Sequence, residues 1–168
     1  MNRIMIIGGC GAGKSTLARK LHQKSGLPVF HLDQYYHLPN WGEPKKEDWR
    51  KTVQQLVKGD QWIIDGNYGS SMDITLAAAD TIIFMDYPTS TCFWRVIKRT
   101  WKHYGQVRPD MPEGCRERFT FDFLHYVAMF GIVKRPGLIE KFSAFLGAKT
   151  RLRSDEETSA FLENWPKH

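Results

Sequence analysis

One segment near the N-terminus guides the interpretation of the whole chain: Gly8-Gly9-Cys10-Gly11-Ala12-Gly13-Lys14-Ser15-Thr16. It fits the pattern G-x-x-x-x-G-K-[ST], which is informative when a strand precedes it and a helix follows it. An apolar run at residues 3–7 comes directly before it, and a helical pattern at 15–24 comes directly after it. Glycines allow several backbone N–H groups to turn toward one anion, and the dipole of the following helix adds to the attraction. We therefore expect residues 8–16 to bind the phosphates of a nucleotide.

Two side chains of this loop have specific expected roles. The ammonium group of Lys14 should reach the β- and γ-phosphates and act in catalysis, and the hydroxyl of Ser15 should be a ligand of Mg²⁺. ATP and Mg²⁺ are therefore the expected cofactors. The alternative is a chance match in a glycine-containing turn, which average composition allows in about 0.5% of chains of this length. The flanking strand and helix make such a chance match rarer still.

Strand and helix patterns alternate along the rest of the chain. Short apolar runs predict four further strands, and apolar residues at helical spacing predict the helices between them. Parallel strands joined by helices form a sheet that is covered on both faces. We therefore predict an α/β fold, the P-loop NTPase three-layer architecture with about five parallel strands, in a single domain of residues 1–168. The predicted strands are 28–32, 61–64, 81–85 and 149–153, and the predicted helices are 47–58, 72–79, 88–104, 118–133, 137–146 and 155–164.

Three aspartates, Asp33, Asp65 and Asp86, each follow a predicted strand. In an open parallel sheet ligands bind outside the carboxyl ends of the strands, so these side chains are candidates to converge on the phosphate loop. Asp65 is the expected Mg²⁺ ligand because Gly66 beside it permits close approach, and Asp33 is the candidate to orient or deprotonate an acceptor hydroxyl. The alternative for each is to cap the loop or helix that follows, and for Asp86 we expect that structural role.

Positive charge is concentrated in one segment. The chain has a formal net charge of +6, and residues 91–135 contain nine Lys and Arg against four Asp and Glu. A Gly- and Pro-containing break between basic helices is typical of a lid, which would exclude water and stabilise the charge of a transferring phosphoryl group. We expect a helical lid at about 91–135, although a solvated basic face is the alternative. The residues concerned are Arg95, Lys98, Arg99 and Lys102 on one helical face, and Arg108, Arg116 and Arg118 in or after the break.

Composition excludes several other classes of protein. The three cysteines, Cys10, Cys92 and Cys115, lack the paired spacing of a zinc site or a disulfide framework. No apolar run approaches the roughly 20 residues of a membrane-spanning helix, and residues 1–7 are too short for a signal peptide. We therefore expect a cytoplasmic location and no membrane partner.

Four stretches carry a resemblance to a known family: Ile6 to Thr16, His31-Leu32-Asp33, Trp62 to Tyr68, and Arg108 to Cys115. They resemble the adenylate-kinase-like P-loop proteins known as DNA topology modulation proteins, and the likeness covers essentially the whole chain. This similarity implies that Asp65-Gly66 is the Asp-Gly pair that ends the third strand and supports Mg²⁺. It also implies that lid-helix arginines stack on adenine and contact phosphate, and that further lid arginines close over the phosphoryl group. The arginines that match are Arg95 and Arg99 for the first role, and Arg108, Arg116 and Arg118 for the second.

One position departs from the adenylate kinases. They continue that Asp-Gly pair with Phe-Pro-Arg, whose arginine holds the monophosphate acceptor, whereas this chain has Asn67-Tyr68-Gly69. The departure argues against AMP as the acceptor, and Asp33 is similar to the carboxylate that meets the acceptor hydroxyl in small-metabolite kinases of the shikimate type. The aromatic residues of the 34–46 loop are expected either to line the acceptor site or to pack on the following helix. These residues are Tyr35, Tyr36 and Trp41.

Three functional hypotheses follow. The leading one is a phosphotransferase of the nucleoside-monophosphate or small-metabolite kinase type, which uses ATP and an unidentified small-molecule acceptor. The second is a nucleotide-dependent DNA-binding protein with Trp94 or Trp101 as stacking groups; it is less favoured because the basic segment is modest and contains no recognised binding motif. The third is a nucleotide-gated switch with little turnover. The sequence specifies neither the acceptor nor an oligomeric state.

Overall fold

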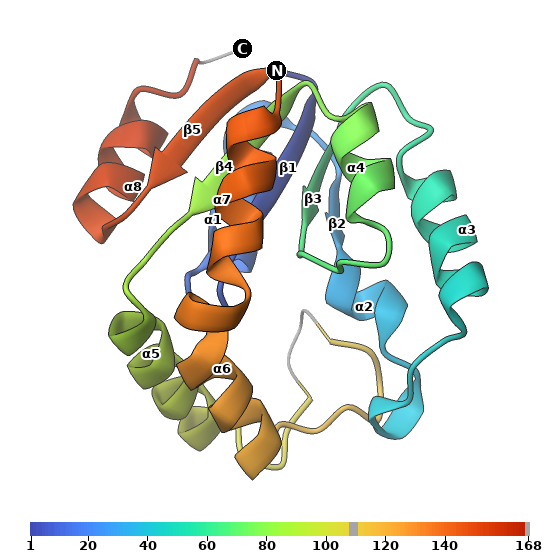
Figure 1. Cartoon of the computed structure of the whole chain (residues 1–168), viewed down its shortest axis with the longest axis vertical. Coiled ribbons are helices and arrows are strands. Elements are labelled where there is room, and N and C mark those ends of the chain that lie inside the picture. The colour runs from blue at the N-terminus through green and yellow to red at the C-terminus, as the bar shows by residue number, and fades with distance from the viewer. Residues whose placement is uncertain (108–110, 167–168) are drawn as a thin grey trace.

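The computed structural model, which describes residues 1–107 and 111–166, contains one parallel sheet with the strand order β2-β3-β1-β4-β5. This arrangement confirms the predicted α/β fold with five parallel strands (Figure 1). β1 lies at the centre, and every neighbouring pair of strands is parallel. The strands are β1 (Arg3–Gly8), β2 (Val29–His31), β3 (Trp62–Asp65), β4 (Thr81–Met85) and β5 (Ala148–Leu152).

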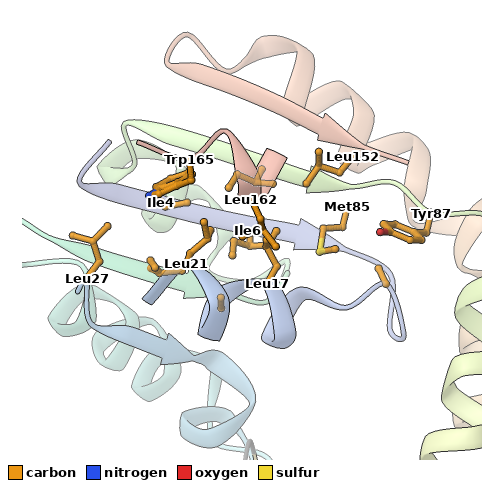
Figure 2. Packing of buried hydrophobic residues seen from close by; sticks show 14 of the residues in the cluster. Ile4, Ile6, Leu17, Leu21, Leu27, Met85, Tyr87, Leu152, Leu162 and Trp165 are labelled. Carbon is orange, nitrogen blue, oxygen red and sulfur yellow. The ribbon is translucent and has the colours of Figure 1, made fainter. Parts of the chain in front are cut away.

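One face of the sheet is covered by α1 (Lys14–Ser25) and α8 (Asp155–Glu163). Side chains of β1 such as Ile4 and Ile6 alternate toward this face, as expected for an extended chain, and meet Leu17 and Leu21 of α1. Figure 2 shows this cluster, with Leu162 and other C-terminal residues closing it from the side of β4 and β5. Burial of this apolar surface anchors the start of α1, and with it the phosphate loop, to the central strand.

The opposite face is covered by α3 (Lys46–Leu56), α4 (Met72–Ala78) and α7 (Arg135–Ala144). Met5 and Ile7 of β1 pack beneath α4 and α7, whereas Trp49 of α3 is buried against β3. The two clusters on this face and the cluster on the other give the three layers that were predicted. The remaining helices, α2 (Leu32–Tyr36), α5 (Thr89–Lys102) and α6 (Phe121–Val133), lie beyond the carboxyl ends of the strands (Figure 1).

Two predicted boundaries are wrong in ways that affect the site. β2 ends at His31, so Asp33 lies in the first turn of α2 and not at a strand end, because the buried side chain of Leu32 begins the helix. Residues 34–46 are also not a plain loop, since they contain the end of α2 and a 3₁₀ turn, η1 (Pro39–Trp41). The helix predicted at 118–133 begins only at Phe121.

No helix in the described part of the chain is long and apolar enough to span a membrane.

Candidate active site

The phosphate loop is the connection between β1 and α1, and two of its glycines are required by their surroundings. Gly11 has φ +85°, and a Cβ atom there would lie 2.3 Å from the carbonyl oxygen of Cys92 on α5. Gly13 has φ +98° and caps the N-terminus of α1. A larger residue at position 11 would push α5 away from the loop, since positive φ and backbone contact both disfavour a side chain. The loop and α5, the helix expected to begin the lid, are therefore packed directly on each other.

Lys14 and Ser15, the first two residues of α1, make different contacts. The Lys14 ammonium group donates to the carbonyl oxygens of Gly8 and Gly9, at 3.0 Å each. The Ser15 hydroxyl donates to Oδ2 of Asp65 at 2.7 Å. Sheet register explains the second contact, because Ile6 of β1 pairs with Asp65 of β3 and the loop follows β1 directly. The structure thus brings together the two residues that the sequence suggested as Mg²⁺ ligands.

Asp65 has a second partner that sequence reasoning did not identify as a site residue. His31 is the register partner of Asp65 across β2 and β3, and its Nδ1 lies 2.5 Å from Oδ1 of the carboxylate. Asp65 is only 4% exposed. A carboxylate with one oxygen on a histidine and the other on a hydroxyl is held in a fixed orientation. The sequence signal for His31 was its position at the end of a predicted strand, level with Asp65.

Hard oxygen donors of this kind suit Mg²⁺, which binds through one or two protein oxygens while phosphates and water complete its octahedron. Ser15 Oγ and the Asp65 carboxylate are therefore a fitting pair beside a phosphate loop. Among the described residues no group of three or more His, Cys, Asp or Glu forms a metal cluster.

Asp33 lies on the other side of the loop, next to Tyr68. The Tyr68 hydroxyl donates to Oδ1 of Asp33 at 2.6 Å. Burial first, and then the charge of Asp33, raise the pKa of Tyr68 far above its ordinary value. Burial likewise raises the pKa of Tyr126 on α6 to about 12, with smaller contributions from Cys10 and Asp33. Tyr68 and Tyr126 both lie within electrostatic range of Asp33 and of Cys10 in the phosphate loop, so this region borders the loop.

Aromatic rings continue from this region toward η1. The rings of Tyr36 and Tyr68 are 4.2 Å apart, and Trp49 of α3 contacts both at 5.0 and 5.1 Å. The ring of His37 contacts that of Trp41 at 5.1 Å. Tyr36 therefore packs on the following helix, α3, which is one of the two arrangements that we expected for the aromatic residues of this segment. Tyr35 is 41% exposed and contacts Phe30, not this group.

The segment between α5 and α6 reaches across to the turn at η1 (Figure 1). The Trp41 indole N–H donates to the carbonyl oxygen of Arg116 at 3.1 Å, and the Cys115 thiol lies 3.4 Å from the carbonyl oxygen of Leu38. Trp41 holds this contact with a positive φ of 64°, which is costly for a residue with a side chain. Cys115 and Arg116 are therefore held against the turn that follows α2.

The predicted lid arginines are placed in different ways. Arg95 forms a 2.6 Å ion pair with Asp155 of α8, and its guanidinium lies 4.8 Å from the ring centroid of Tyr87. Arg99 is 3.5 Å from the buried carboxylate of Glu117, which also accepts from the Thr100 hydroxyl at 2.8 Å. The roles of both in nucleotide binding stay predictions. Arg108 lies outside the described residues, and Arg116 and Arg118 are exposed.

Asp86 has the structural role that was expected. Its carboxylate accepts from Arg135 at 2.7 and 2.9 Å and from Arg151 at 3.0 and 2.5 Å. Burial acts to raise the pKa of Asp86, but the hydrogen bonds from the two arginines outweigh it and lower the pKa. The group joins the end of β4 to the start of α7 and to β5, at a distance from the Ser15–Asp65 pair.

Together the sheet order and the loop define the class: the chain has the fold of the P-loop kinases. Solved structures with this fold include shikimate kinase from Bacteroides thetaiotaomicron, with a TM-score of 0.59, 17% identity, and coverage of 96% of this chain and 94% of that chain. Shikimate kinase from Acinetobacter baumannii in complex with shikimate gives a TM-score of 0.62 at 14% identity, covering 97% and 89%. A gluconokinase from Sinorhizobium meliloti 1021 gives 0.56 at 16% identity, covering 96% and 91%.

The sequence itself matches no family model and no curated protein. At identities of 14 to 17% the likeness to these structures establishes the fold and leaves the reaction to be argued from the site. None of these three neighbours bears the name of a DNA topology modulation protein, so that part of the expected resemblance is not confirmed.

Proposed function

We propose that the chain is a phosphotransferase that moves the γ-phosphoryl group of Mg²⁺-bound ATP to a hydroxyl group of a small molecule. The observation that carries the proposal is the 2.7 Å contact between Ser15 and Asp65 beside a phosphate loop, with a second carboxylate, Asp33, on the acceptor side. This arrangement separates an ion-holding carboxylate from one that faces the acceptor. Kinase chemistry requires that division of roles.

Each residue would have one task. Residues 8–16 would hold the phosphates, and Lys14 would leave the carbonyl oxygens of Gly8 and Gly9 to contact the β- and γ-phosphates. Ser15 and Asp65 would hold Mg²⁺, which neutralises charge on the phosphates when bound. Asp33 would orient the acceptor hydroxyl and accept its proton, while Arg99, Arg108 and their lid neighbours would stabilise charge on the transferring group.

The test is an assay of ADP release from ATP·Mg²⁺ with a panel of nucleoside monophosphates, nucleosides and small hydroxylated metabolites. Acceptor-dependent release that requires Lys14 would support a kinase and name its substrate class. Tight ATP binding without release for any acceptor would contradict the proposal and favour a nucleotide-gated switch.

His31 should contribute to the binding of the metal–nucleotide complex through Asp65. We expect His31→Ala to weaken the apparent Mg²⁺ affinity by about tenfold or more, as is usual when the partner that orients a carboxylate ligand is removed. The measurement is a Mg²⁺ titration of the affinity for a fluorescent ATP analogue, which requires no turnover. His22→Ala is the matched control, because His22 is exposed at the far end of α1. Equal Mg²⁺ dependence in both variants would show that His31 does not act through Asp65.

A second candidate function, binding of single-stranded nucleic acid, is favoured by one observation. Trp94 and Trp101 are 62% and 79% exposed and lie seven residues apart on α5, with Lys98 exposed between them. Exposed aromatic rings beside cations form stacking platforms for bases. If this surface binds DNA, Trp101→Ala should lower the affinity by about 1–3 kcal/mol, and the affinity should fall steeply with salt. Fluorescence anisotropy with a labelled oligonucleotide at 50 and 200 mM salt is the measurement; weak binding that Trp101→Ala leaves unchanged would exclude this function.

A further inference from the structure

We infer that the acceptor is an uncharged hydroxyl compound with a flat or apolar ring face, and not a phosphate or a carboxylate. This inference rests on the proposed function and concerns the acceptor region, defined as Asp33, Tyr36 and Tyr68.

Hydrogen-bond donors in the acceptor region are already committed to carboxylates. The proton of the Tyr68 hydroxyl goes to Asp33, and that of the Tyr36 hydroxyl goes to Glu43 at 3.0 Å. Burial first, and then Glu43, raise the pKa of Tyr36, so its proton is retained. What these hydroxyl groups still offer is oxygen lone pairs, as does the second oxygen of Asp33. Such a surface accepts hydrogen bonds from a hydroxyl group and has no spare tyrosine proton to give to an anion.

The arginine on α3, next to the Trp49 that contacts Tyr68, is already paired. Arg50, on the helix that packs behind Tyr68, donates to Asp73 at 2.9 and 2.8 Å and to the carbonyl oxygen of Ser70 at 2.6 Å. In the described part of the chain no Lys or Arg side chain forms a hydrogen bond or ion pair with Asp33, Tyr36 or Tyr68. The Asp33 carboxylate therefore repels a phosphate or carboxylate, and no ion pair formed by the described residues compensates for this repulsion.

The rings of Tyr36 and Tyr68 offer a surface to a planar or apolar partner. Tyr36 and Tyr68 are tilted by 35° at 4.2 Å, and both are only partly buried, so the group presents ring faces and edges next to Asp33. Aromatic rings favour a planar or apolar partner, because offset contacts between such surfaces are stabilising beyond simple burial. A hydroxyl compound with a base, an unsaturated ring or the apolar face of a sugar ring satisfies both the rings and the carboxylate.

The test compares acceptors in matched pairs that differ only in charge: a nucleoside with its 5′-monophosphate, and a neutral sugar with the sugar acid of the same carbon skeleton. We expect kcat/KM for the neutral member to exceed that for the anionic member by about tenfold or more. Preference for the anionic member would overturn the inference while leaving the kinase intact. If no acceptor is turned over, the proposed function fails. Calorimetric binding of the same pairs with a non-hydrolysable ATP analogue then still decides the charge preference.

Variants locate the source of the preference. Asp33→Asn should lower turnover of every acceptor and, in addition, reduce the ratio between neutral and anionic members in the binding experiment, because the repulsion is removed. Asp60→Asn is the matched control, since Asp60 is exposed before β3 and should leave the ratio unchanged. A ratio that persists in Asp33→Asn would contradict the electrostatic argument. Arg118→Gln adds an independent test: a loss of binding confined to anionic acceptors would show that the lid recognises acceptor charge and would overturn the inference.

Discussion

Lys14→Ala should abolish ATP-dependent phosphoryl transfer, with kcat/KM lowered by at least about a thousandfold, or about 4 kcal/mol of transition-state stabilisation. The ammonium group is already placed over the phosphate loop by the carbonyl oxygens of Gly8 and Gly9, 3.0 Å away. Transfer of a phosphoryl group involves little covalent chemistry on the protein, so catalysis depends on positioning and charge. Substitution of Lys14, the only lysine in residues 8–16, removes the cation that we expect to contact the β- and γ-phosphates. Steady-state ADP release with the preferred acceptor measures the effect.

Two controls separate this loss from misfolding. Lys20→Ala removes an exposed lysine from the next turns of α1 and should retain full activity. Lys14→Met keeps most of the methylene chain but not the charge, and it should be as inactive as Lys14→Ala. Melting temperatures of all three variants should stay close to that of the wild type, because Lys14 contacts only carbonyl oxygens of the loop. A folded Lys14→Ala protein with more than about a tenth of wild-type activity would contradict a role for this lysine in transfer.

The fold was predictable because its strongest patterns are local. Buried strands such as Ile4–Ile7 and Thr81–Met85 are short apolar runs bounded by turns, and the phosphate-loop motif fixes what precedes and follows it. The pairing of Ser15 with Asp65 was also accessible, since Asp65 ends β3 and Ser15 follows the loop at the end of β1, and a parallel sheet places these two strand ends side by side. Strand ends that meet at one edge of a sheet are a consequence of topology, not of fine packing.

Other parts of the site depend on contacts that no local pattern encodes. The role of His31 could be identified only from its register with Asp65 in the sheet. Asp33 lies in α2 and not at the expected strand end, because the helix begins at the buried residue Leu32. The lid was predicted as a basic segment, yet Arg99 is paired within it to Glu117, 18 residues further along the chain. Such pairings depend on how two helices and a long connection pack together. Periodicity indicates which residues share a face but not which partners they meet.

Asp86→Ala should have the largest effect on stability, lowering the free energy of unfolding by about 2–3 kcal/mol at pH 7. Loss of one partner from a buried ion pair costs about 3–5 kcal/mol. We expect a smaller loss for Asp86→Ala because the side chains of Arg135 and Arg151 are 40% and 29% exposed. The Asp86 side chain is itself only 3% exposed and accepts hydrogen bonds from both arginines. Urea unfolding followed by tryptophan fluorescence measures the difference, and Asp122→Ala, at an exposed position in the first turn of α6, is the control.

The loss of stability in Asp86→Ala should also depend on pH, in a direction set by the pKa of Asp86. Burial would raise the pKa of Asp86, but Arg135 and Arg151 outweigh it, so the folded pKa lies below the unfolded value of about 3.9. A lowered pKa means that the carboxylate stabilises the fold above the unfolded pKa and that this contribution is lost as the pH falls through the folded pKa. The difference between wild type and Asp86→Ala should therefore be constant from pH 7 to about 5 and should shrink below about pH 4. A difference that grows in acid would show that the ionised carboxylate is not what stabilises this junction of β4, β5 and α7.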